Sequence, residues 1–457
     1  MSTRVKKSRE YGETNIAYIK SNISIFIFLF FVVLLAEINS FPLGLLMVVS
    51  FVLLAFRSTE LLLTMCFVSA IYSNHFLLIN SVFPRVIEVI TIVFFALLLG
   101  KRRGILRINS LRSTLLLFFI YMVGVTIFRF ESIEGFTKIF DVIIAILLIL
   151  LFPPNLNLKN ASLQVLFASI VIISKIGVQL LSGNYASRLF TNGLDSGMIV
   201  LWENVNSNVF CVNIGVISCL IIGYTLIMLK NNILRIFGFI LWALCIVVIL
   251  RVGSRMVAIS SITSFLILIF YLSKRKNNIS LNALLKRLII FVATFGILFY
   301  IYTKFVISNS LLAQRFTLAS IVNSKGTGRL LIWIEVIDYL KSNISHLIFG
   351  SGLGSTIIAE VLSNVGRGYT SCHNIILEVL FHFGIIGTII FVIIIEGVLR
   401  IIYRFKDYND ILIYGLAFIC LLINGFGEGI YTIKLFWFII MLILGYETKI
   451  RKQLCKT

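Results

Sequence analysis

Long apolar runs separated by short polar stretches dominate the chain. A helix needs about 20 predominantly apolar residues to cross the hydrocarbon core of a bilayer. Runs near or somewhat below that length predict membrane-spanning helices at 21–38, 42–56, 60–79, 83–100, 113–128, 138–152, 162–181, 205–229, 234–250, 254–272, 287–306, 374–398, 410–425 and 433–446. The shortest of these runs are also compatible with re-entrant segments. The pattern predicts an all-α polytopic fold with about 12–14 transmembrane helices, in which residues 1–457 form a single membrane domain.

Composition excludes a soluble globular protein and a disordered chain. Of the 457 residues, 59% are hydrophobic and 13% are charged, whereas soluble globular proteins are about 25% charged. So few charges could not cover a water-soluble surface. Aromatic residues make up 13% of the chain and there are 4 prolines, which is unlike a disordered chain.

The distribution of charge predicts the orientation of the helices. The chain has 40 Lys and Arg against 19 Asp and Glu, a net charge of +21 that in a soluble protein would suggest nucleic-acid binding. In a membrane protein, basic connections mark the cytoplasmic side. With a cytoplasmic N-terminus, the connections 101–112, 230–235, 274–287 and 400–406 and the C-terminal tail carry nearly all of the excess charge. We therefore expect both termini in the cytoplasm and no nucleic-acid partner.

Metal and cofactor sites are not predicted. The 7 cysteines include no CxxC pair, the 4 histidines form no cluster along the chain, and there is no Ser-His-Asp signature. Most cysteines lie in apolar runs, where a free thiol behaves as a small hydrophobic group.

Two connections on the outer side are long, at 182–204 and 307–372. Within the large external loop 307–372, residues 327–343 have the spacing of an amphipathic helix, with Arg329, Trp333, 336 and 340 on one face. The glycine-rich stretch 349–355 follows. It is a weak dinucleotide fingerprint, because neither a predicted strand nor a βαβ unit surrounds it. It is compatible with a tight turn that presents backbone N–H groups to an anion, or with a merely flexible loop.

Three positions on this side are candidates for chemistry. Ser371 as an N-cap would place His373 and Asn374 in the first turn of a helix, where free N–H groups suit phosphate, although an interfacial structural role for His373 is an alternative. Arg255 ends the turn RVGSR; the alternative to a role in chemistry is that it anchors the helix at the membrane interface. Arg188 is the single cation of 182–204. His382, in the middle of a predicted span, is expected to be a hydrogen-bonded bundle residue.

Most ionisable residues inside or beside the predicted spans are expected to lie toward the outer ends of those spans. Such residues either extend to the interface or mark a polar cavity, and here they predict a polar chamber that opens outward. They are Glu37, Glu88, Asp141, Lys175, Lys304, Glu378 and Lys434.

The order of these motifs resembles that of the bacterial O-antigen polymerase and ligase superfamily, the Wzy-type polymerases and WaaL-type ligases. An outer-loop Arg188 precedes a span that opens with asparagines (203–210), a GSR turn follows at 253–255, and the external loop carries R-x-x-x-W at 329–333, FGSGLGS and then HNIILEVLFHFGIIG at 373–387. The resemblance covers roughly 185–400.

The resemblance implies a GT-C-like, metal-independent, inverting glycosyltransferase that acts on the outer face of the inner membrane. The donor would be a glycan on undecaprenyl pyrophosphate, and the acceptor a sugar hydroxyl. By motif position, His373 would act on the acceptor hydroxyl, while Arg188, Arg329 and Arg255 would bind the pyrophosphate. The supporting residues would be Asn374, Trp333, Gly352 and Gly354.

Three functions compete at this point. We favour a polymerase that joins carrier-linked repeat units into O-antigen or capsular polysaccharide, with membrane lipids and a Wzz-like chain-length regulator as partners. A ligase that transfers glycan to lipid A core shares the same motifs. A transporter or flippase would show ionisable residues at the bilayer midplane and repeat symmetry, and the sequence shows neither.

Overall fold

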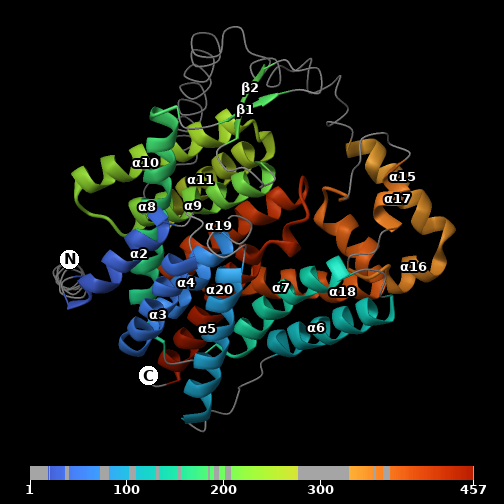
Figure 1. Ribbon diagram of the computed structural model, residues 1–457, viewed down its shortest axis with the longest axis horizontal. Coiled ribbons are helices and arrows are strands. Elements are labelled where there is room, and N and C mark those ends of the chain that lie inside the picture. Colours follow the sequence, from blue (N-terminus) through green and yellow to red (C-terminus); the bar gives the residue numbers. More distant parts are fainter. Residues whose placement is uncertain are drawn as a thin grey trace.

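The protein is an assembly of helices (Figure 1). The computed structural model describes Ile19 and residues 21–35, 41–72, 82–101, 110–129, 133–152, 156–183, 186–189, 195–200, 207–275, 329–353, 357–363 and 371–455. The predicted span at 287–306 lies outside these residues.

Each of the other predicted spans coincides with a helix. The membrane helices are α2 (Ile23–Leu35), α3 (Phe41–Arg57), α4 (Glu60–Tyr72), α5 (Val82–Lys101), α6 (Ser110–Phe128), α7 (Ile133–Leu150), α8 (Leu158–Leu181), α9 (Ser207–Ile227), α10 (Asn232–Val252), α11 (Arg255–Arg275), α18 (Ile375–Arg404), α19 (Asn409–Gly425) and α20 (Lys434–Leu454). The external loop contributes α15 (Arg329–Ser342), α16 (Ile344–Phe349) and α17 (Ile357–Ser363), and a 3-10 turn, η2 (Ile430–Thr432), precedes α20.

The helical polytopic fold is confirmed. Of the described helices, α6, α8, α9, α10, α11 and α18 are long and apolar enough to cross a membrane, and several shorter helices are also apolar. The described part departs from an all-helical structure in one short antiparallel hairpin of β1 (Ala186–Leu189) and β2 (Asp195–Val200), within the outer connection 182–204.

The helix ends gather in two groups, as alternating spans require. In one group, the hydroxyl of Tyr271 near the end of α11 donates to Asp407 between α18 and α19, at 2.7 Å. The guanidinium of Arg451 near the end of α20 lies over the ring of Phe405. The opposite group contains the candidate site. We call it the outer end, after the charge pattern; which side of the membrane it faces stays a prediction.

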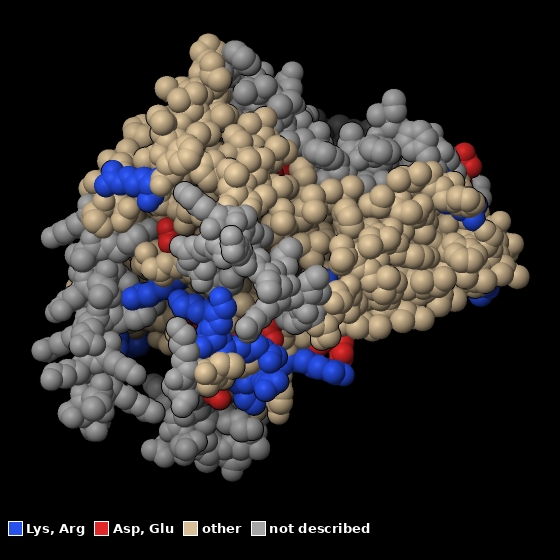
Figure 2. Space-filling view, turned by 90° about the horizontal axis from the view of Figure 1, so that it is seen from below, with Lys and Arg blue, Asp and Glu red and all other residues tan. Residues whose placement is uncertain are grey.

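Basic residues are unevenly distributed over the surface. Figure 2 shows Lys and Arg side chains gathered on one part of the face seen from below, while the arm to the right is coloured mostly tan. In Figure 1 this arm contains α15, α16 and α17, beside the ends of α6 and α18.

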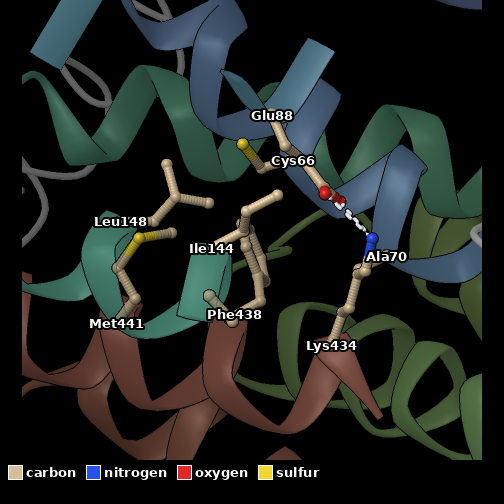
Figure 3. A pocket seen from close by; sticks show the side chains of 9 residues that line it. Cys66, Ala70, Glu88, Ile144, Leu148, Lys434, Phe438 and Met441 are labelled. Carbon is tan, nitrogen blue, oxygen red and sulfur yellow. Dashed lines mark hydrogen bonds and ion pairs between the residues drawn. The ribbon is translucent and has the colours of Figure 1, made fainter. Parts of the chain in front are cut away.

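A buried ion pair joins α5 to α20. Figure 3 shows the carboxylate of Glu88 in contact with the ammonium of Lys434, beside a small cavity that apolar side chains and Cys66 also line. The Nζ atom of Lys434 lies 2.8 Å from Oε2 of Glu88, and the hydroxyl of Ser69 donates to Oε1 at 2.7 Å. Both charged residues are more than nine-tenths buried. Their charges are therefore balanced within the bundle.

Breaking this pair from one side should destabilise the fold. We expect Lys434→Met to lower the free energy of unfolding by about 3–5 kcal/mol, because it leaves the Glu88 charge buried without a counter-charge. The double variant Glu88→Gln, Lys434→Met should regain most of the loss. The control Lys341→Met breaks an exposed pair with Asp338 and should cost less than about 1 kcal/mol. Unfolding in detergent measures all three. A double variant as unstable as the single one would show that the pair is not the cause.

Two more of the predicted outer-end charges have protein partners. Lys175 donates to the backbone oxygens of Val33 and Leu34, and Glu378 accepts a hydrogen bond from Ser371. Together with Glu88 and Lys434, these residues need no outward polar chamber to explain their positions. Glu37 and Lys304, and the side chain of Asp141, lie outside the described part of the chain.

Candidate active site

A single buried carboxylate organises the candidate site. Glu428 lies in the short connection between α19 and η2 and is 7% exposed. Its carboxylate contacts three side chains from distant parts of the chain: Asn208 at the start of α9, Arg329 at the start of α15, and His373 just before α18. Three elements are thereby joined at the outer end.

Glycines on both sides allow Glu428 to reach this position. A Cβ atom at Gly427 would lie 3.0 Å from Nη1 of Arg329, and one at Gly429 would overlap the carboxylate of Glu378. The connection therefore fits between α15 and α18 because neither neighbour of Glu428 has a side chain.

The pairing of His373 with Glu428 fixes the role of each ring nitrogen. Nδ1 of His373 lies 3.1 Å from Oε2 of Glu428. An ionised carboxylate only accepts hydrogen bonds, so Nδ1 carries the hydrogen and Nε2 is the basic nitrogen. The side chain of His373 is 17% exposed. A carboxylate that holds an imidazole in one tautomer is the arrangement found beside general bases.

Two arginines lie beside this pair. Nη2 of Arg329 is 3.6 Å from Oε1 of Glu428, and the Arg329 side chain is 24% exposed. Arg255 is the first residue of α11, and the next residue, Met256, packs beside Gly427 as Arg329 does. The outer end therefore presents Arg329 beside Glu428 and Arg255 at the start of α11, and arginine side chains suit an anionic ligand.

The segment that carries His373 differs from its predicted form. Asn374, and not Ser371, is the N-cap of α18: its side-chain oxygen accepts from the backbone N–H groups of Ile376 and Leu377, at 3.0 and 3.2 Å. His373 therefore precedes the helix and has a φ of 49°. A non-glycine residue in this region is uncommon, and the backbone turn aims the ring at Glu428. Asn374 thus supports the site by ending this turn.

Helix α15 forms where predicted and holds the His373 segment in place, but it is not amphipathic as predicted, because Leu330, Leu331, Ile334 and Ile337 are exposed on its outer face. Ile332, Val336 and Leu340 are buried on its inner face. The indole N–H of Trp333 donates to the carbonyl of Cys372 at 3.0 Å. Burial, with a smaller contribution from the Glu378 carboxylate, raises the pKa of the Cys372 thiol well above its usual range. Cys372 therefore stays a neutral thiol and does not compete with His373 for a role in the chemistry.

The glycine-rich stretch does not present its described N–H groups to a ligand. Ser351 N donates to Phe381 O and Gly352 N to His382 O, each at 2.9 Å. The expectation of an anion-binding turn is wrong for these residues, because a break in α18 provides the acceptors. His382 is hydrogen-bonded as expected, with Nδ1 2.8 Å from the carbonyl oxygen of Gly352. Gly354 lies outside the described residues.

Arg188 is placed only by its backbone. It lies on strand β1, whose partner β2 contacts α10, and its side chain is not among those described. Its predicted role with Arg329 stays a prediction.

Glu428 and Asn208 are the residues that sequence reasoning missed. Glu428 follows the predicted span at 410–425 and lies between two glycines, which is a signal that an acidic residue packs closely at the outer end. Asn208 belongs to the asparagine-rich start of a span, but nothing in the sequence singles it out from its neighbours. Among the described residues, no three His, Cys, Asp or Glu side chains form a metal-binding group.

The fold and the site define a polytopic helical membrane protein with a His–Glu pair and arginines at the outer end of the bundle. Residues 238–392 match a family model described as O-antigen ligase. The match covers about a third of the chain and confirms the resemblance to the O-antigen polymerase and ligase superfamily. It includes Arg255, Arg329 and His373, whereas Asn208 and Glu428 lie outside it. No curated protein matches the chain.

Proposed function

We propose that this protein is a membrane glycosyltransferase that joins undecaprenyl-pyrophosphate-linked repeat units into O-antigen or capsular polysaccharide on the outer face of the inner membrane. The observation that carries the proposal is the buried Glu428 carboxylate, which holds His373 3.1 Å away and Arg329 3.6 Å away. Glu428 thus holds a base, His373, close to a cation, Arg329, that can stabilise a leaving group.

The arginines stabilise the departing carrier pyrophosphate. As the bond between the sugar C1 and the phosphate oxygen breaks, negative charge develops on the leaving group. Guanidinium groups bind phosphate oxygens in pairs and remain charged at any working pH. Arg329 and Arg255 supply this charge, with Arg188 as a third contact from the β1 strand. Since arginine does this work, the transfer needs no divalent metal.

His373 takes the proton of the acceptor. Nε2 accepts the proton of the sugar hydroxyl while the hydroxyl oxygen forms its bond to C1 of the donor. Glu428 stabilises the imidazolium that results and holds the ring in one tautomer. Attack from the face opposite the leaving group occurs in one step, so the configuration at C1 inverts.

A ligase is the second candidate, and the family match is equally consistent with it. It would use the same base and the same arginines, and would differ in its acceptor, the sugar of a lipid A core. We prefer the polymerase because the family motifs match only loosely and the chain is rich in Asn, Ile and Phe, as in variable, serotype-specific loci.

Purified protein given a carrier-linked repeat unit, with EDTA and without core lipid, tests the proposal. We expect a ladder of longer chains on the carrier. Product that appears only after lipid A core is added would identify a ligase. Turnover that appears only after Mg²⁺ or Mn²⁺ is added would contradict the arginine-based mechanism. Reporter or cysteine labelling of Gly366 and of the C-terminal tail checks that the site faces outward.

A further inference from the structure

The length of helix α6 fixes the depth of its residues in the bilayer. It has 19 residues, or about 28 Å at 1.5 Å per residue, which barely matches a hydrocarbon core of about 30 Å. The whole helix is therefore needed to cross the membrane, and its outer end at Phe128 lies at the edge of the core. Phe128 is 85% exposed and Ile127 59%, as expected for residues that face lipid.

The external loop touches α6 well below that edge. The hydroxyl of Tyr121 lies 3.1 Å from the carbonyl oxygens of both Phe349 and Phe383. Tyr121 is about two turns before Phe128, which puts these contacts about 10 Å inside the core. Phe383 lies eight residues into α18, about 12 Å from the start of that helix.

Non-helical backbone at this depth must have every polar group paired. Helix α18 is broken at Gly384, where φ is 63°, and the stretch after α16 fills the break. Gly350 N donates within α16, and Ser351 N and Gly352 N donate to carbonyls of α18. Leu353 N donates to the hydroxyl of Thr126, on α6, at 3.2 Å. Every backbone N–H from 350 to 353 has a partner, as burial in hydrocarbon requires.

The outward side of this segment is apolar. Ile344 is 66% exposed, Ile348 36% and Phe349 50%. The patch continues along α6 through Ile120, which is 58% exposed, and along α18 through Ile389, which is 56% exposed. Both are lipid-facing positions of spanning helices. In Figure 2 the arm that carries these elements shows few Lys, Arg, Asp or Glu side chains.

We propose that residues 344–353 form a re-entrant segment that dips into the leaflet at the outer end of the bundle, with Ile344, Ile348 and Phe349 against the acyl chains of membrane phospholipids. Because α16 directly follows α15, immersion of α16 also holds one end of the helix that begins at Arg329. The inference does not depend on the proposed enzymatic function.

Fluorescence quenching of variants with one exposed cysteine tests the depth. Cys455 is the exposed cysteine, whereas the other six are buried, so the full chain with Cys455→Ser is the background. Ile348→Cys and Ile344→Cys report on the segment. Ile120→Cys is the lipid-facing control on α6, and Lys341→Cys is the aqueous control on α15, where the side chain is 70% exposed. Each variant is labelled with bimane and placed in phosphatidylcholine–phosphatidylglycerol vesicles.

Two quenchers then distinguish the environments. We expect a phospholipid with a nitroxide midway along its acyl chain to reduce the fluorescence of labels at 344, 348 and 120, and iodide to reduce only the label at 341. Iodide quenching at 348 equal to that at 341 would overturn the proposal. Protection of 344 and 348 from both quenchers would also overturn it, because a protein surface would then cover the segment.

Discussion

Replacing His373 with alanine should reduce chain growth by at least about 10²-fold and leave donor binding nearly intact. Proton transfer by a positioned base contributes about 10²–10⁴-fold to a rate, and the pyrophosphate would still bind to the arginines. The measurement is glycan chain length and rate with the carrier-linked repeat unit, beside donor affinity. Because φ at His373 is 49°, His373→Asn is the better matched variant, since asparagine tolerates this backbone.

His346→Ala provides the control for the loss of a histidine in the same loop. Nδ1 of His346 pairs with the hydroxyl of Tyr339 and not with Glu428, and we expect near-normal activity. The amount of protein in the membrane must be equal for all variants. Long chains made by His373→Ala at normal expression would show that His373 is not the base, even though the family match would stand.

The spans could be predicted from the sequence because of one physical constraint. In a bilayer, backbone groups must pair within the protein, and a helix pairs nearly all of them within its own segment, so a typical crossing is a long apolar helix that leaves a continuous signal. Helices α9 and α11 follow the predicted runs 205–229 and 254–272 closely. The same signal hides the break in α18, because Gly384 lies within an apolar run and its partners come from 350–352.

Only those site residues that belong to local motifs could be predicted from the sequence. His373, Arg329 and Arg255 could be named because their motifs are local; the structure places His373 and Arg329 on Glu428 and Arg255 at the start of α11. Glu428 is 55 residues from His373 and 220 from Asn208, so its role appears only when the helices pack. A carboxylate that acts through partners far away in the chain has no local pattern.

The N-cap of α18 could not be chosen from the sequence, because two suitable residues lie three positions apart. Both Ser371 and Asn374 are residue types that cap helices. The contact between Ser371 and the Glu378 carboxylate removes the serine from that role, and Asn374 takes it. The result moves His373 out of the first helical turn. Tertiary contacts therefore decide the geometry of the base.

Replacing Glu428 with glutamine should also reduce the transfer rate, by about 10²-fold or more. The amide keeps the size of the side chain and can still accept from Asn208, but it cannot stabilise an imidazolium or hold Arg329 by charge. The rate of chain growth is the measurement. Glu360→Gln, the same change on an exposed position of α17, is the matched control and should be neutral.

Combining the two site variants tests whether Glu428 works through His373. Residues that act as a unit show losses that do not multiply. We therefore expect Glu428→Gln to cause little further loss in a His373→Asn background, although it is severe in the wild-type chain. A purely structural role for Glu428 would lower the amount of folded protein in both backgrounds. If the two losses multiplied at equal protein amounts, Glu428 would act independently of His373, and the pairing at 3.1 Å would not be the source of catalysis.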